Sequence, residues 1–199
     1  MAGSSMADAV FYYDFYSPYS YLAAERVNAE LPVVPEWKPI SFGHLLQKTG
    51  RRPWSFDRGS EWEAHWDAIR GRAAERGLPE PRIPDGWPIE TYSLLGARAA
   101  TFAKGSGRAV AYSLALFRQV FAGGRTLDED TVLLAGAACE LHPNAVLKGI
   151  ESRTVKDALA AATDEAFELG VQGIPTIALD GELFWGDDQL GEAAAALRN

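Results

Sequence analysis

The feature that most constrains the fold is a junction near the N-terminus, where an apolar extended segment changes at once into a helical one. Residues 10–15 are almost all aromatic or aliphatic and predict a buried strand. Ser17 and Pro18 then form a typical helix start, because serine caps exposed amides and proline at the first helical position loses no needed hydrogen bond. We expect this helix to run to about residue 30.

The opening unit is completed by a second extended segment. Pro32 ends the predicted helix, and residues 33–40 contain two further prolines, Pro35 and Pro39. Proline cannot donate a hydrogen bond to a neighbouring strand, so this segment predicts an edge or irregular strand. The chain therefore opens as a β-α-β unit.

The middle of the chain has a different pattern. Residues 43–154 contain no convincing strand, and two loops rich in glycine, proline and arginine interrupt them at residues 49–55 and 77–88. We interpret this region as an all-helical insertion. Its predicted helices span residues 43–48, 60–76, 89–106, 107–122, 128–141 and 144–151.

Mixed structure returns near the C-terminus. A predicted helix at residues 155–169 is followed by strands at residues 176–179 and 182–185. The Asp-Gly pair between those strands is the strongest hairpin signal in the chain. A last helix through residue 197 completes the order of elements, with Asp187 or Asp188 as its expected cap.

This order of elements predicts an α/β chain with a thioredoxin-like fold that is interrupted by helices. We assign residues 8–42 plus 155–199 to the thioredoxin-like domain and residues 43–154 to the helical insertion domain.

Composition limits the classes of function. Lys and Arg number 19 against 27 Asp and Glu, a net charge of -8, which argues against a nucleic-acid partner. No apolar run reaches the ~20 residues of a membrane helix. Residues 1–8 lack the basic and apolar regions of a secretory signal. With a single cysteine in the sequence, we expect a cytoplasmic protein.

Metal binding is not expected. His44, His65 and His142 are far apart in the sequence and have no zinc-type spacing, although Glu61 and His65 share a face if their segment is helical. Cys139 lies in a helical apolar segment and is predicted to be a buried, inert thiol.

The junction also carries the first candidate site. In thiol redox proteins a strand-to-helix junction of this kind carries Cys-x-x-Cys, but here Ser17 and Ser20 occupy both cysteine positions. The protein therefore has no dithiol of its own at this point. The Ser17 hydroxyl can still hydrogen-bond the thiolate of a ligand, whereas Ser20 is expected to pack or cap locally.

Gly-Ile-Pro-Thr at residues 173–176 is the second candidate site. In the thioredoxin fold a proline here is cis and faces the first junction, which leaves the backbone of Ile174 free to pair with a peptide-like ligand. The alternative is that Pro175 only starts an edge strand.

Together these motifs resemble the DsbA-like thioredoxin superfamily, and within it the 2-hydroxychromene-2-carboxylate isomerases and the related kappa-class glutathione transferases. The resemblance covers nearly the whole chain. Its segments are DFYSPYSYLA at residues 14–23, GVQGIPT at 170–176 and DGELFWGDDQL at 180–190.

The resemblance implies that glutathione binds as a cofactor and that the Ser17 hydroxyl hydrogen-bonds its sulfur. A helix N-terminus also favours a thiolate over a thiol, while the alternative role of Ser17 is a simple N-cap. Asp188 is expected to receive the γ-glutamyl amine, and the amides after Gly186 the carboxylate. Asp187 stands where relatives have a neutral residue, so its charge is expected to weaken that carboxylate site.

Substrate contacts are expected from four residues. Tyr16 and Tyr19 flank the junction and could line a pocket for an aromatic substrate. Arg51 or Arg52 could clamp a substrate carboxylate, or simply be solvated. The family usually has asparagine at the positions of Arg51 and Glu90, and these two charged replacements could pair with each other.

The expected function is a glutathione-dependent cis-trans isomerase of an aromatic-catabolism intermediate, and relatives make a homodimer the natural expectation. Three alternatives stay open. The chain could be a kappa-type glutathione transferase, it could use another low-molecular-weight thiol, or it could be a non-catalytic binding protein with a thioredoxin-like fold.

Overall fold

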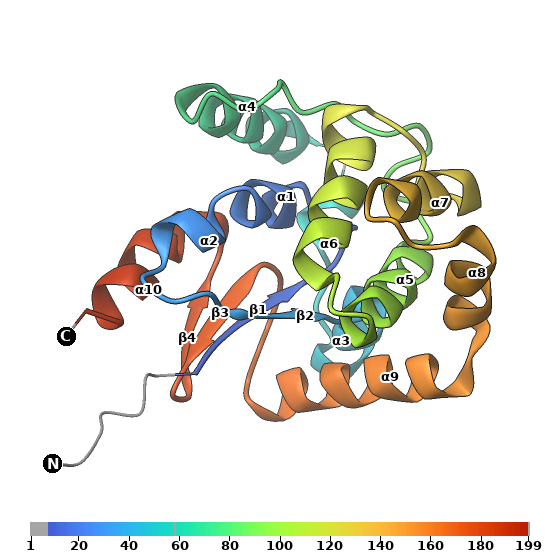
Figure 1. Cartoon of the computed structure of the whole chain (residues 1–199). Helices are drawn as coiled ribbons and strands as arrows, with labels where there is room; N and C mark the ends of the chain where they lie inside the picture. Colours follow the sequence, from blue (N-terminus) through green and yellow to red (C-terminus); the bar gives the residue numbers. More distant parts are fainter. Residues whose placement is uncertain (1–7, 58, 199) are drawn as a thin grey trace, which may run out of the picture.

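A four-stranded mixed sheet in the order β2-β1-β3-β4 forms the centre of the computed structural model, which describes residues 8–57 and 59–198 (Figure 1). β1 (Ala9–Tyr13) pairs with β2 (Glu36–Pro39) in parallel and with β3 (Thr176–Leu179) in antiparallel orientation. β4 (Glu182–Trp185) completes the hairpin with β3. The predicted edge position of the proline-containing strand is confirmed.

The hairpin has the bounds that its sequence predicts. Ile177 lies opposite Phe184, and Leu179 lies opposite Glu182. The connecting Asp180 and Gly181 both have positive φ angles, 47° and 90°, as the tight turns preferred in two-residue hairpins require.

The first helix is not continuous, contrary to the sequence prediction. α1 (Pro18–Ala24) ends at Ala24, and α2 (Val27–Glu30) follows after a turn. At that turn Arg26 leaves helical geometry, with φ -120° and ψ -31°, and its guanidinium donates to the backbone oxygen of Asp187 at 3.0 Å. The local sequence pattern does not indicate this break, which coincides with a contact to a distant segment.

The helices between residues 42 and 168 gather beside and around the sheet (Figure 1). The described residues of this region contain no strand. The helices are α3 (Phe42–Thr49), α4 (Ser60–Glu75), α5 (Ser93–Gly105), α6 (Ala109–Phe117), α7 (Glu129–Ala138), α8 (Pro143–Glu151) and α9 (Arg153–Glu168), with a 3-10 turn η1 (Trp54–Phe56) and a π-helical turn η2 (Arg118–Ala122). Among them, α4 packs across α1, and α9 packs against α3 and α5.

The starts of α5 and of the C-terminal helix differ most from the predictions. α5 begins at Ser93 and not at residue 89, because residues 85–90 form turns around a cis Trp87-Pro88 bond. At the C-terminus a 3-10 turn, η3 (Asp187–Gln189), precedes α10 (Leu190–Ala196). The predicted capping role of Asp187 or Asp188 is wrong, since neither helix has a side-chain cap and Asp187 is paired with arginines.

The helical region and the sheet share a continuous hydrophobic core. Tyr13 of β1 contacts the ring of Phe117 of α6, with centroids 5.8 Å apart, and its hydroxyl hydrogen-bonds Ser113 at 2.6 Å. Phe15 packs on Phe117 at 4.6 Å. These contacts hold the end of β1, where the first candidate site begins, rigidly against α6. In the described part of the chain no helix has the length and apolar character to cross a membrane.

Candidate functional site

A pocket of about 540 Å³ opens at the N-terminus of α1. Its walls come from five places: the junction after β1, the segment from Phe42 to Arg72, the turn at Trp87, the loop before β3, and the end of β4 with the turn that follows it. Ser17, Ile174 and Pro175 therefore line the same cavity, although Ser17 precedes Ile174 by 157 positions in the sequence. The lining also includes Tyr16, Pro18, Tyr19, Phe42, Arg51, Arg52, Pro53, Trp54, Ser55, Glu61, His65, Trp87, Gln172, Gly173, Trp185, Gly186, Asp187 and Asp188.

Ser17 is the N-cap of α1. Its Oγ accepts a hydrogen bond from the amide of Ser20 at 3.2 Å, and 7% of the residue is exposed, on the pocket side. Ser20 is fully buried, and its Oγ has no partner among the described residues. Of the two positions where redox proteins carry cysteine, only the first is therefore open to a ligand.

The Ile174-Pro175 peptide bond is cis, as predicted. Pro175 is anchored by its carbonyl oxygen, which accepts from the amide of Gly186 at 2.9 Å. Within the described residues, neither the amide nor the carbonyl of Ile174 hydrogen-bonds another group. A side chain at Gly173 would lie 2.6 Å from the ring of Trp185, so glycine is required beside this backbone.

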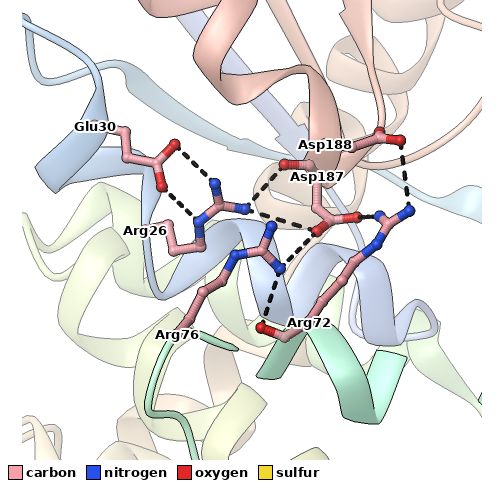
Figure 2. Close-up of polar contacts among 6 residues, drawn as sticks. All are labelled: Arg26, Glu30, Arg72, Arg76, Asp187 and Asp188. Carbon is pink, nitrogen blue, oxygen red and sulfur yellow. Dashed lines mark hydrogen bonds and ion pairs between the residues drawn. The ribbon is translucent and has the colours of Figure 1, made fainter. Parts of the chain in front are cut away.

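Asp187 lies at the centre of an arginine cluster (Figure 2). Its carboxylate is fully buried and pairs with Arg72 through Oδ1 and with Arg76 through Oδ2 at 3.4 Å. Arg26 approaches Oδ2 at 3.7 Å and is itself paired with Glu30. Burial raises the pKa of the Asp187 carboxyl, and Arg72 and Arg76 oppose that rise.

This cluster corrects one expectation. The sequence indicates that Asp187 adds a free negative charge to the predicted carboxylate site, but the structure pairs that charge with three guanidinium groups. Asp188 is different, because its side chain is 56% exposed and meets only Arg72 among them, at 3.5 Å (Figure 2). Of the two aspartates, Asp188 is therefore the one whose carboxylate remains accessible from the pocket.

Tyr16 closes the pocket beside Ser17. Its hydroxyl hydrogen-bonds Ser55 Oγ at 2.5 Å, and its backbone oxygen accepts from Trp87 Nε1 at 2.9 Å. Its ring contacts those of Phe42 and Trp87, with centroid distances of 5.4 Å and 5.7 Å. Burial raises the pKa of Tyr16 to about 12, so it is a neutral aromatic wall.

Tyr19 faces a group of residues from the 3-10 turn η1 and α4. Its hydroxyl lies 2.7 Å from Nδ1 of His65, whose ring stacks on Trp54 at 4.1 Å. The guanidinium of Arg72 lies 5.5 Å from the centre of the Tyr19 ring. Sequence reasoning missed Trp54, His65 and Arg72 as site residues. The i, i+4 spacing of Glu61 and His65 was the sequence signal that could have identified this face of α4 as part of the site.

Arg51 and Arg52 are exposed at the mouth of the pocket. Arg51 lies over the ring of Trp185 at 4.7 Å, and Arg52 donates to the backbone oxygen of Phe56 at 3.4 Å. The pairing of Arg51 with Glu90 that the sequence allows does not occur among the described residues, where Glu90 is exposed beside Gly86.

Asp14 lies behind the junction and is fully buried. It accepts hydrogen bonds from the amides of Phe42 at 2.7 Å and Tyr16 at 3.3 Å, and from Ser93 Oγ at 3.2 Å. Burial raises its pKa to about 6, although these hydrogen bonds lower it. This carboxyl therefore ties the pocket wall at Tyr16 to the starts of α3 and α5.

The protein itself cannot carry out thiol exchange in this cavity, because no cysteine lines it. Cys139 is buried at the end of α7, does not line the pocket, and has a pKa raised by burial. Within the described residues no group of histidine, cysteine and acidic side chains could hold a metal ion.

Comparison with known proteins agrees with this geometry. The model of the DSBA-like thioredoxin domain matches residues 9–198. The chain belongs to this family. A 2-hydroxychromene-2-carboxylate isomerase of Sphingobium xenophagum is 25% identical over 192 residues, which cover 90% of this chain and 92% of that protein.

Solved structures share the fold. A 2-hydroxychromene-2-carboxylate isomerase structure superimposes with a TM-score of 0.85 at 22% identity and covers 96% of this chain and 94% of its own. A probable DsbA oxidoreductase from Streptomyces coelicolor has a TM-score of 0.73 at 19% identity, over 96% of this chain and 90% of its own. The predicted membership of the DsbA-like branch and the predicted fold class are confirmed.

Proposed function

We propose that this protein is a glutathione-dependent cis-trans isomerase of an aromatic compound, similar to 2-hydroxychromene-2-carboxylate isomerase. The observation that carries the proposal is the Ser17 hydroxyl, which lines an aromatic pocket together with the cis Ile174-Pro175 peptide. The relative of 25% identity supports the same class of reaction.

The residues of the pocket fit a peptide-like thiol. The free amide and carbonyl of Ile174 match the backbone of an extended peptide, and the Ser17 hydroxyl can donate to a thiolate near them. Asp188 is accessible for an ammonium group. When bound, the thiol would supply a nucleophilic sulfur that adds reversibly to a conjugated double bond.

Substrate binding is assigned to the aromatic wall and to the mouth of the pocket. Tyr16 and Tyr19 offer rings to an aromatic substrate, and Arg51 and Arg52 supply positive charge at the entrance. A planar guanidinium binds a carboxylate through two parallel hydrogen bonds, so an aromatic acid is the substrate class that matches both features.

The test is product analysis with the purified protein, glutathione and an aromatic cis-alkenyl keto acid. An isomerase returns the trans compound together with free glutathione. A stable thioether would instead identify a kappa-type transferase, which needs the same activated thiolate.

A second measurement addresses the cofactor. Calorimetry with glutathione and other low-molecular-weight thiols should show selective binding. The ultraviolet absorbance of the bound thiolate, followed as the pH changes, should give a thiol pKa well below the free value of about 8.5. Absence of binding by any thiol would favour a non-catalytic binding protein.

A further inference from the structure

The pocket contains a hydrogen-bonded tyrosine-histidine pair whose polar groups have no role in the proposed function so far. The Tyr19 hydroxyl and Nδ1 of His65 are 2.7 Å apart. Trp54 stacks on His65 with an angle of 17° between the rings, and Arg72 lies over the Tyr19 ring. Arg72 is in turn fixed by its ion pair with the buried Asp187 (Figure 2). Both members of the pair are therefore held by neighbours.

We propose that Tyr19 is a catalytic residue, whose hydroxyl donates a hydrogen bond to the carbonyl oxygen of the substrate, and that His65 positions this hydroxyl. The inference rests on the proposed isomerase function. When a nucleophile adds to a double bond conjugated with a carbonyl group, negative charge moves onto the carbonyl oxygen. A preorganised donor at that oxygen lowers the barrier, as in an oxyanion hole.

Position and charge state suit Tyr19 to this role. It lines the same cavity as Ser17 and is separated from it in the chain only by Pro18. Burial raises the pKa of Tyr19 to about 12, so the hydroxyl keeps its proton. Asp187 and Asp188 raise this pKa further, and Arg72 opposes them.

His65 has only one ring hydrogen to place in this pair, because its imidazole is neutral. Burial lowers the pKa of His65, with Arg72 acting in the same direction and Glu61 against it. The imidazole is therefore neutral at pH 7.5 and carries a hydrogen on only one of its nitrogens.

The tautomer of His65 decides whether the Tyr19 proton is available. If the hydrogen of His65 is on Nδ1, it is donated to the Tyr19 oxygen, and the tyrosine proton is free for a ligand in the pocket. If the hydrogen is on Nε2, Nδ1 must accept from Tyr19, and that proton is already used. The proposal therefore requires the Nδ1-H tautomer.

The first test measures this tautomer and needs no substrate. In the full chain labelled with nitrogen-15 histidine, the chemical shifts of the ring nitrogens distinguish the two forms, and His65→Asn identifies the signal against those of His44 and His142. We expect a protonated Nδ1 and a bare Nε2 at pH 7.5. A protonated Nε2 with a bare Nδ1 would overturn the inference.

The second test separates catalysis from binding. Tyr19→Phe keeps the ring that contacts Arg72 and Trp54. It should lower kcat about 100-fold while KM and thiol affinity change less than about threefold. The matched control is Tyr92→Phe, a residue that is 56% exposed and outside the pocket. An unchanged kcat, or a loss confined to KM, would overturn the catalytic role of Tyr19.

Variants of His65 test its positioning role. His65→Asn keeps an amide donor near the place of Nδ1 and should retain much of kcat, whereas His65→Leu should approach the loss seen with Tyr19→Phe. Equal activity of His65→Leu and the wild-type protein would refute positioning. If the wild-type protein isomerises nothing, the proposed function fails, and the tautomer measurement still decides the state of the Tyr19 hydroxyl.

Discussion

Arg72 of helix α4 pairs with Asp187 in the turn after β4, and this contact joins the inserted helices to the sheet at the wall of the pocket. The same arginine lies over Tyr19 and reaches Asp188. One side chain of α4 therefore contacts both Tyr19 of the proposed substrate site and Asp188 of the proposed thiol site.

Removal of the Asp187 charge should destabilise the protein strongly. Asp187→Asn leaves three partly buried guanidinium groups without their common partner, and the expected loss is about 3 kcal/mol in the free energy of unfolding. Urea denaturation measures it. Asp188→Asn is the matched control, because this exposed carboxylate should contribute less than about 1 kcal/mol. Equal losses from the two variants would show that burial of Asp187 does not matter.

Ser17→Ala tests the proposed thiolate donor. The hydroxyl is expected to act on the developing charge of the sulfur and not on the rest of the ligand, so turnover should fall about 100-fold while thiol affinity changes less than about threefold. Ser20→Ala, three residues along the same helix turn but fully buried, should leave turnover within about twofold. Full turnover in Ser17→Ala would remove Ser17 from the mechanism.

Asp14 should make stability depend on pH. Its pKa is raised from an ordinary 3.8 to about 6 by burial, so between these values the folded state holds a proton that the unfolded state has lost. The associated stabilisation, about 3 kcal/mol, is complete below pH 4 and is lost as the pH rises through 6.

The variant Asp14→Asn should lack this dependence. The difference in unfolding free energy between wild type and variant, measured in urea at pH 4 and pH 7, should therefore change by about 3 kcal/mol. The exposed Asp8→Asn serves as control and should show no such change. Parallel curves for wild type and Asp14→Asn would mean that the Asp14 carboxyl titrates normally.

Gly96 allows close packing of α5 on the junction. A methyl group there would lie 2.9 Å from Phe15 Cδ2 and 3.1 Å from Leu116 Cδ2, both fully buried. Gly96→Ala should therefore destabilise by about 2 kcal/mol. Gly71→Ala, at an exposed position of α4 with open space around it, should stabilise by up to about 1 kcal/mol. A stabilised Gly96→Ala protein would show that the core can absorb a methyl group here.

Local sequence patterns were sufficient to predict much of the fold. The Asp-Gly hairpin signal predicts both strand bounds, and Ser17-Pro18 predicts the start of α1 to the residue. Turn chemistry and helix capping depend on neighbours in the chain, so they can be recognised without any knowledge of the tertiary structure. The cis Ile174-Pro175 bond was predicted from the position of its motif in the order of elements.

Contacts between distant segments explain what could not be predicted. The break at Arg26 and the neutralisation of Asp187 involve α1, α4 and the turn after β4, which are far apart in sequence. The Tyr19 and His65 pair likewise depends on how α4 lies across α1. Residue types and spacing establish the serine junction and the fold class. The packing of the inserted helices decides which charges and rings surround that serine, because their energies arise only when separate segments come within a few ångströms of one another.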